Sequence, residues 1–268
     1  MFQKLRQILT TPRAAAAPLA AIPAGQRVYA VGDIHGRLDL FEALLEALSA
    51  DDLASPRAET TLVLLGDLID RGPDSAGVIA RVRQLQAEGD TRILGGNHEE
   101  MFLQSLDDLG IFRTLLRHGG RETALSFGID QTAFDAADME EAQAMVRAAL
   151  PEDVVAFLHG LEEMVRIGDY LFVHAGINPA VPLYEQRPKD LRWIREPFLS
   201  YAAPYGAVVV HGHTITDAPE DTGNRIGIDT GAFTTGRLTA LRLEGTDRRY
   251  IQTQEQAGGT IVTEVLAG

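Results

Sequence analysis

The chain of 268 residues contains no cysteine. Thiol nucleophiles, disulfide bonds and thiolate metal sites are therefore excluded, together with the enzyme classes that depend on them. Positive charge is also scarce, because 24 lysine and arginine residues stand against 38 aspartate and glutamate residues, which gives a formal net charge of −14. Nucleic-acid phosphates require a basic protein face, so we expect no nucleic-acid partner.

A long hydrophobic run is missing as well. Residues 1–26 mix basic residues with alanine and proline, and this segment is too weakly apolar for a signal peptide and too short for a membrane span. We predict a loosely ordered extension over residues 1–26, in which Phe2, Leu5 and Leu9 would form one apolar stripe on a short helix. We expect no stable membrane insertion and predict a cytoplasmic protein.

Five short polar motifs are present, and each follows a brief apolar run. The motifs are GDIHG (32–36), GDLIDRG (66–72), GNHE (96–99), HAG (174–176) and HGHT (211–214). The apolar runs before them are typical of buried strands, and helical spacing follows the first two motifs at residues 38–50 and 74–88. This order predicts an α/β fold with a parallel sheet, whose ligands bind at the carboxyl ends of the strands.

The motifs supply oxygen and nitrogen ligands: Asp33, His35, Asp67, Asn97, His174 and either His211 or His213. Divalent transition metals prefer such donors, and a catalytic ion must keep positions free for water and substrate. So many ligands overfill one ion, which implies a pair of ions of the kind that hydrolyses phosphate esters. Asp67 lies between the other ligands in the sequence, and we predict that it bridges the two ions. The sequence leaves the choice between His211 and His213 open.

The motif set resembles that of the calcineurin-like metallophosphoesterases. The resemblance is to the phosphoprotein phosphatase branch, which includes bacteriophage lambda protein phosphatase and bacterial symmetrical diadenosine tetraphosphatases. Weaker echoes are HGG near His118, WIRE at 193–196 and GIDTGA at 227–232. The resemblance implies a four-layer α/β/β/α sandwich with two mixed sheets, and we expect the strand-like runs at residues 225–228, 238–243 and 250–253 to form the second sheet.

The resemblance also implies a domain organisation. Residues 27–268 are expected to form a single metallophosphoesterase domain, in which residues 100–160 are a helical, cap-like insertion over the active site. Such an insertion shapes the substrate pocket. Trp193 either forms one wall of the cleft or packs in the core. His118 and His159 lie in helix-like stretches, and we interpret them as structural or exposed.

The resemblance implies a complete ligand set: Asp33, His35 and His213 for one divalent ion, Asp67 as the bridge, and Asn97 and His174 for the second ion. The GHT pattern of the family selects His213 over His211, whose contribution stays open. Manganese is the expected metal, with iron and zinc as alternatives, because the same donors suit several divalent ions.

The resemblance assigns the catalytic roles to four further residues. His98 is the general acid toward the leaving oxygen, and Asp70 holds it protonated. A positioned imidazolium of this kind contributes about 10² to 10⁴ in rate. Arg71 and Arg195 bind phosphoryl oxygens, which the planar fork of a guanidinium matches.

The predicted reaction is hydrolysis of phosphomonoesters by in-line attack of a metal-bound hydroxide, without a phosphoenzyme. We expect a serine/threonine protein phosphatase that also accepts phosphotyrosine, so the partner is a phosphorylated protein or a small phosphate. The alternative is a symmetrical dinucleoside tetraphosphate hydrolase, in which Arg113, Arg117 and Arg121 are candidates for holding nucleotides. A general small-molecule phosphatase and a catalytically silent binding module are the remaining hypotheses, and the intact catalytic set speaks against the silent module. The oligomeric state is not predicted.

Overall fold

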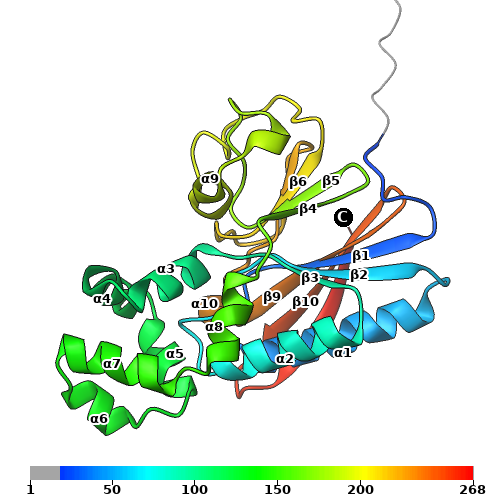
Figure 1. Ribbon diagram of the computed structural model, residues 1–268. Coiled ribbons are helices and arrows are strands. Elements are labelled where there is room, and N and C mark those ends of the chain that lie inside the picture. The colour runs from blue at the N-terminus through cyan, green and yellow to red at the C-terminus, as the bar shows by residue number, and fades with distance from the viewer. Residues whose placement is uncertain (1–18, 268) are drawn as a thin grey trace, which may run out of the picture.

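The computed structural model describes residues 19–267 (Figure 1). The predicted apolar stripe of Phe2, Leu5 and Leu9 lies outside the described residues. No helix within residues 19–267 is long and apolar enough to cross a membrane.

The described part of the predicted N-terminal extension is bound to the rest of the molecule. The side chain of Ile22 is 2% exposed. Its amide donates to the carbonyl of Gly245 (2.8 Å), and the carbonyl of Ala21 accepts from the amide of Asp169 (3.1 Å). The chain is therefore fixed several residues before position 27, because one apolar side chain and its backbone partners anchor it. The predicted extension can be described only over residues 19–26, and residues 1–18 lie outside the described residues.

Two mixed sheets form the centre of the molecule. In the first sheet the strand order is β11-β10-β9-β1-β2-β3, and in the second it is β4-β5-β6-β8-β7. The first sheet contains β1 (Gln26–Val31), β2 (Glu59–Leu64), β3 (Thr91–Ile93), β9 (Arg237–Glu244), β10 (Asp247–Glu255) and β11 (Ile261–Ala267). The second contains β4 (Met164–Ile167), β5 (Tyr170–Val173), β6 (Val208–His211), β7 (Glu220–Asp221) and β8 (Arg225–Gly227).

Alternating side chains of the strands fill separate cores. Val28 and Ala30 of β1 pack between the two sheets, whereas Tyr29 and Val31 face the helices. This alternation is the two-residue period of a strand that is buried on both faces. Helices α1 (Leu38–Ala54) and α2 (Ser75–Glu88) cover the first sheet (Figure 1). The far side of the second sheet packs against the segment with α9 (Pro188–Trp193), which completes the predicted four-layer sandwich.

One part of the predicted topology is wrong. The runs at residues 238–243 and 250–253 were expected in the second sheet with residues 225–228. Of these three runs, only the one at residues 225–228 joins the second sheet, as β8 beside β6. β9 instead pairs antiparallel with β1, and β10 pairs with β9, so both strands extend the first sheet. Sequence periodicity shows that a segment is a strand but does not show which neighbour it pairs with.

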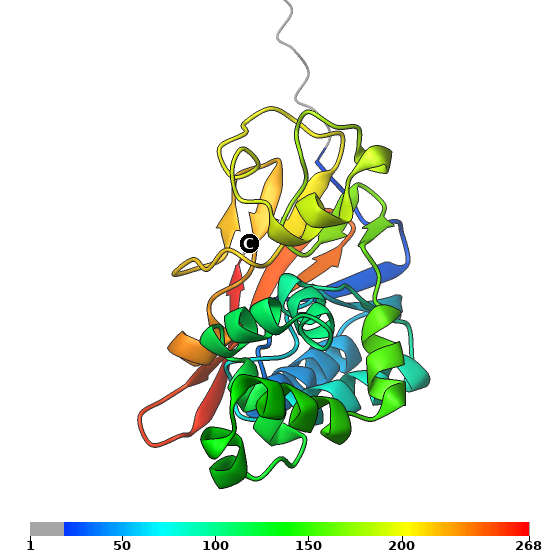
Figure 2. The ribbon, with the colours of Figure 1, turned by 60° about the vertical axis from the view of Figure 1, so that its left-hand side comes forward.

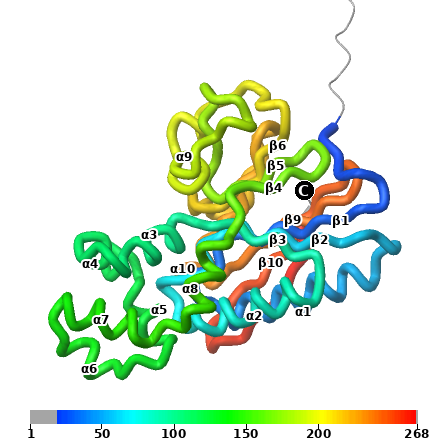
Figure 3. Tube along the Cα trace, in the orientation of Figure 1, coloured from blue at the N-terminus to red at the C-terminus, as the bar shows by residue number. Residues whose placement is uncertain are grey.

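A group of six helices joins β3 to β4, and we call residues 100–159, which follow the GNHE motif, the helical segment. The group comprises α3 (Asn97–Ser105), α4 (Leu109–Arg117), α5 (Gly120–Ser126), α6 (Gln131–Ala136), α7 (Met139–Ala149) and α8 (Glu152–His159). The helices gather on one side of the molecule (Figure 2), and the chain passes from α8 directly into β4 (Figure 3). The short helices η1 (Leu183–Glu185) and α10 (Ala232–Thr235) lie elsewhere in the chain.

Candidate active site

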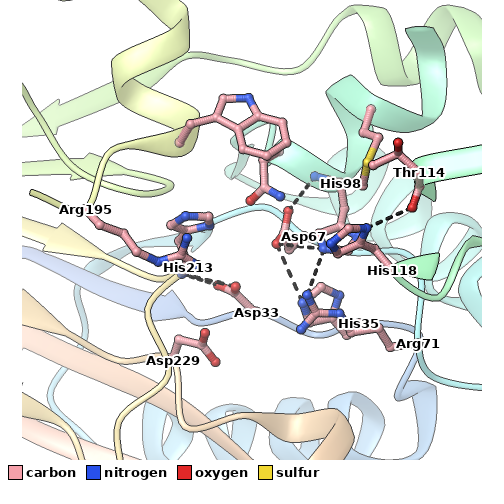
Figure 4. A pocket seen from close by; sticks show the side chains of 13 residues that line it. Asp33, His35, Asp67, Arg71, His98, Thr114, His118, Arg195, His213 and Asp229 are labelled. Carbon is pink, nitrogen blue, oxygen red and sulfur yellow. Dashed lines mark hydrogen bonds and ion pairs between the residues drawn. The ribbon is translucent and has the colours of Figure 1, made fainter. Parts of the chain in front are cut away.

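The predicted metal ligands meet where strands of both sheets end. Each of the strands β1, β2, β3, β5 and β6 ends at or just before its ligand motif. All six ligand side chains are buried: Asp33, His35, Asp67, Asn97, His174 and His213. Five of them line one cleft, and His174 is fully buried beside it. Figure 4 shows Asp67 near the centre of this cleft.

The carboxylate of Asp67 lies between imidazole groups that can bind metal ions. Its Oδ2 is 3.6 Å from Nε2 of His35, and its Oδ1 is 3.4 Å from Nε2 of His174. Two groups of donors converge closely enough to hold an ion, and both include Asp67: His35, Asp67 and His98 form one, and Asp67, His174 and His213 form the other. A carboxylate shared by two groups has the geometry of a bridging ligand.

The grouping differs from the sequence prediction in one respect. His213 was expected to share an ion with Asp33 and His35. Its ligand atom instead groups with those of Asp67 and His174, and its ring lies 5.2 Å from the ring of His174. The amide of His213 still donates to Asp33 Oδ1 (3.1 Å), which connects the two halves of the site. Motif order along the chain does not reveal which side of the bridge a side chain reaches.

Backbone carbonyls set the orientation of two imidazoles. Nδ1 of His35 donates to the carbonyl of Ile69 (2.8 Å), and Nδ1 of His174 donates to the carbonyl of Leu65 (2.8 Å). A carbonyl can only accept, so the proton lies on Nδ1 and the lone pair on Nε2 faces the site. Nε2 of His213 is buried and has no hydrogen-bond partner among the described residues. Imidazole nitrogens whose lone pairs face the site fit a metal centre.

Burial keeps the same imidazoles neutral and crowds the carboxylates. Desolvation lowers the pKa of His35 and of His213 to about 3. Burial and the charges of Asp229 and Asp67 raise the pKa of Asp33. Burial likewise raises the pKa of Asp229 to about 6. Neutral imidazoles are the form that binds metals, and cations would offset the repulsion between the buried carboxylates.

Backbone strain is concentrated in the predicted site. Among residues 19–267, five residues other than glycine have a positive φ: His35 (48°), Asp67 (47°), Asp70 (72°), Arg71 (70°) and His213 (63°). Every one of them is a predicted metal ligand or catalytic residue. Such conformations cost about 1–3 kcal/mol each and persist only where the surrounding structure imposes them, which is common at functional sites.

His98 and Asp70 form a close pair beside the metal ligands. Nδ1 of His98 lies 2.6 Å from Oδ2 of Asp70, and both side chains are buried. Burial lowers the pKa of His98, but the charges of Asp67 and Asp70 outweigh it, so the pKa is raised. The guanidinium of Arg71 lies 3.1 Å from Nε2 of His98. The sequence prediction of a carboxylate-bound imidazole therefore has its counterpart in the geometry.

The helical segment holds Asp70 and Arg71, which the sequence did not indicate. The hydroxyl of Thr123 in α5 donates to Asp70 Oδ1 (2.6 Å) and accepts from the amide of Asp70 (2.9 Å). The amide of Arg71 donates to the carbonyl of Gly119 (3.0 Å). A Cβ at Gly119 would lie 2.5 Å from that amide nitrogen, so only glycine permits this approach. The HGG echo was the available signal for Gly119.

Phe233 and Glu99 also support the site and were not predicted. The guanidinium carbon of Arg71 lies 4.3 Å from the centre of the Phe233 ring, a cation–π contact. The carboxylate of Glu99 accepts from the amides of Gly96 (2.8 Å) and Asp67 (3.0 Å). Glu99 therefore fixes two ligand loops together. The last letter of GNHE was the only sequence signal for it.

Three other residues singled out in the sequence are Arg195, His211 and His118, and two of them line the cleft. Arg195 lines the cleft near His213 (Figure 4). His211 is buried against Phe198, with its ring 5.0 Å away, and belongs to neither group of donors. His118 is exposed at the end of α4, in agreement with its interpretation as structural or exposed, and it also lines the cleft.

Of the three arginines predicted to hold nucleotides, none lines the cleft, and Arg121 is paired with Asp135 (2.6 Å). The helical spacing that places Thr114 and His118 toward the cleft directs Arg113 and Arg117 elsewhere.

Comparison with known proteins agrees with the motifs and the geometry. The model of the calcineurin-like phosphoesterase family matches residues 26–229. The chain belongs to this family and is a metal-dependent phosphoesterase, a hydrolase. Calcineurin-like phosphoesterases use a dinuclear centre of divalent metal ions. The resemblance and the fold class that the sequence predicted are therefore confirmed.

Two relatives represent different activities. The asymmetrical bis(5'-nucleosyl)-tetraphosphatase PrpE of Bacillus subtilis is 28% identical over 234 residues, which cover 79% of this chain and 88% of that protein. Serine/threonine-protein phosphatase 1 of Salmonella typhimurium is 31% identical over 224 residues, which cover 82% of this chain and 93% of that protein. The family therefore leaves the substrate of this chain undecided.

A solved structure shares the fold. The crystal structure of a candidate diadenosine tetraphosphatase aligns with a TM-score of 0.59 and 23% sequence identity, covering 92% of this chain and 98% of that one. At this identity the likeness is one of fold alone.

Proposed function

We propose that this protein hydrolyses phosphomonoesters as a serine/threonine protein phosphatase that also accepts phosphotyrosine. One observation carries the proposal: the two donor groups that share Asp67 open into the same cleft as His98, Arg71 and Arg195. A cleft with metal ligands, two guanidinium groups and a candidate proton donor has the parts that phosphoryl transfer to water requires.

The proposed ligands of the two ions combine members of the two donor groups with Asp33 and Asn97, which line the same cleft. Asp33 and His35 would hold one ion, Asn97, His174 and His213 would hold the other, and Asp67 would serve both. Asn97 supports this division, because its Oδ1 lies 2.9 Å from Nε2 of His174. When bound, the ions activate water and neutralise charge on the phosphoryl group. Manganese is the proposed metal.

The side chains of the chain itself perform the remaining steps. Arg71 and Arg195 bind the phosphoryl oxygens, which places the ester over Asp67. Arg71 then turns from Nε2 of His98 toward the phosphoryl group, and this leaves Nε2 free to carry a proton. His98 donates that proton to the leaving oxygen, while Asp70 accepts from Nδ1 and stabilises the imidazolium.

We also propose that residues 27–268 act as a single metallophosphoesterase domain, with residues 100–160 as its insertion, and that the protein is cytoplasmic. The donors of the site come from both sheets, so neither sheet carries a complete site alone. Met101, Thr114 and His118 reach the cleft from the insertion.

A dinucleoside tetraphosphate hydrolase is the second candidate. The 28% identity to the Bacillus subtilis tetraphosphatase favours it. The arginines predicted to hold nucleotides speak against it, because none of them lines the cleft. A protein phosphatase needs no nucleotide site, so we place it first.

A substrate comparison tests the choice. Manganese-loaded protein is given a phosphoserine peptide, a phosphothreonine peptide or diadenosine tetraphosphate at equal concentration, and kcat/KM is measured for each. We expect the phosphopeptides to be cleaved at least about tenfold faster, a difference of about 1.4 kcal/mol in activation free energy. Faster cleavage of diadenosine tetraphosphate would contradict the first proposal and support the second. Products of that reaction distinguish symmetrical from asymmetrical cleavage.

A further inference from the structure

Trp193 stands in the catalytic cleft with a large part of its ring uncovered. It ends α9 and is 39% exposed, so it is not a core residue. Among residues 19–267, Tyr184 and Tyr201 are also exposed, but neither lines this cleft. An exposed aromatic face in a cleft is available to a bound ligand, because aromatic side chains commonly line ligand pockets.

The indole is held in one orientation. Its Nε1–H donates to Oε2 of Glu100 in α3 (2.8 Å). Nη1 of Arg192 lies 3.6 Å from the same carboxylate oxygen, and Nη2 of Arg192 binds Oε1 of Glu163 (2.6 Å). The ring is therefore oriented by one hydrogen bond to Glu100, and Arg192 in turn pairs with the Glu100 carboxylate. A ring that is already ordered loses little conformational entropy when it binds a partner.

The helical segment supplies further lining to the same cleft. Met101, Thr114 and His118 line it together with Trp193. The thioether of methionine makes favourable contacts with aromatic rings. Nδ1 of His118 bonds the carbonyl of Thr114 in its own helix (2.8 Å), which fixes the ring. The lining beyond the metal ligands is thus suited to a flat, apolar group with polar edges.

We propose that Trp193 is a specificity-determining residue through which the site, besides serine and threonine esters, also accepts phosphate esters whose leaving group carries an aromatic ring. The inference rests on the proposed function, because it takes the phosphoryl group to bind at Asp67 and the arginines. With the phosphorus fixed there, a ring on the leaving oxygen stacks on the indole, whereas a serine side chain is too short to cover it. Offset or edge-to-face pairs of aromatic rings are favourable beyond the area they bury.

Three substitutions of Trp193 distinguish an effect of the aromatic ring from an effect of side-chain size. Trp193→Phe keeps a ring and loses the bond to Glu100, Trp193→Leu keeps bulk without a ring, and Trp193→Ala removes both. We compare kcat/KM for phosphotyrosine and phosphoserine peptides of one sequence. Trp193→Leu and Trp193→Ala should lose about threefold to tenfold on phosphotyrosine, mainly through KM, and stay within about twofold on phosphoserine. Trp193→Phe should retain most of the phosphotyrosine activity.

Diadenosine tetraphosphate forms a third arm, since a nucleobase is another source of an aromatic ring. If Trp193→Leu loses kcat/KM only on the phosphotyrosine peptide, the indole stacks on aryl esters. If it loses kcat/KM only on diadenosine tetraphosphate, the indole stacks on nucleobases. Tyr184→Ala is the matched control, because Tyr184 is an exposed aromatic residue that does not line the cleft. It should change none of the three rates.

Fluorescence gives a test that needs no turnover. Trp193 is the only tryptophan of the chain, so the emission of the wild-type protein reports on this residue. Titration with phenylphosphonate should change the emission at lower concentration and more strongly than titration with methylphosphonate. Equal changes in emission with both phosphonates would overturn the inference. So would an equal loss of kcat/KM by Trp193→Leu on the phosphotyrosine and phosphoserine peptides. Wild-type protein that cleaves no phosphomonoester would instead overturn the proposed function, and the titration would still decide the role of Trp193.

Discussion

At the strand ends the candidate metal ligands are buried and several have a strained backbone, whereas in the helical segment the residues that reach the cleft have ordinary backbone conformations. Asp67 is 2% exposed and has a φ of 47°. His118 is exposed and ends a regular helix. The strand ends therefore supply a fixed set of donors, and the helical segment supplies a surface that a substrate can meet.

The strand ends and the helical segment are not fully separate in role, because α5 also contacts two of the proposed catalytic residues. Thr123 bonds the carboxylate of Asp70, and Gly119 accepts from the amide of Arg71. The helical segment thus both shapes the pocket and positions two residues of the GDLIDRG motif. A segment that lines the substrate pocket can also support residues of the chemical step.

The largest effect is expected at the strand ends. Asp67→Asn removes the only carboxylate that both donor groups share, so kcat/KM should fall by at least about a thousandfold, because several kcal/mol of charge stabilisation are lost. Activity assays and circular dichroism check this loss against an intact fold. A folded variant with wild-type activity would remove the bridging role of Asp67.

His98→Asn tests whether His98, which follows β3, is a proton donor or a metal ligand. Loss of the proton donor should lower kcat on phosphoserine peptides by about 10² to 10⁴, with a smaller loss on esters with better leaving groups. His98 also belongs to one of the two donor groups, so the metal content of the variant must be measured. Unchanged metal content supports the acid role, and loss of one ion would show that His98 is a ligand.

Thr123→Val tests whether the helical segment contributes to chemistry. Valine keeps the shape and removes the hydroxyl that bonds Asp70, so the free energy of unfolding should fall by about 1–3 kcal/mol. We expect kcat to fall about tenfold, since a hydrogen bond to a charged group is worth about 1.5–3 kcal/mol. Thr123→Ser keeps the hydroxyl and should stay near wild type. A stable Thr123→Val variant with unchanged kcat would restrict the segment to substrate binding.

His118→Ala should have the smallest effect. The residue lines the cleft without belonging to either donor group, so KM for a phosphopeptide should rise about threefold while kcat stays within about twofold. His159→Ala is the control, because His159 is exposed at the end of α8 and does not line the cleft. A large fall in kcat of His118→Ala would move this residue into the catalytic machinery.

The sequence predicted which side chains meet at the strand ends because this information is local. Each ligand follows an apolar run by one to four residues, and the ends of neighbouring strands must meet. The same locality placed β5 at residues 170–173 and α1 from residue 38 onward, as observed. Strand ends and motifs therefore predict which ligand side chains meet, without information on distant contacts.

Features that depend on distant contacts were missed. Thr123 lies 53 residues from Asp70 in the sequence, and β9 lies some two hundred residues from β1 although the two strands pair. No local pattern records such pairings. For the same reason the sequence could not show that His213 groups with His174, or that His118 reaches the cleft.

The metal content of the active protein tests the central claim most directly. Purified protein is analysed for metals, stripped with a chelator, assayed on an aryl phosphate and on a phosphopeptide, and assayed again after addition of manganese. We expect two ions per chain, no turnover by the stripped protein and recovery with manganese, because Asp67 and its neighbours would act through bound ions. Full turnover by protein shown to be free of metal would contradict this claim.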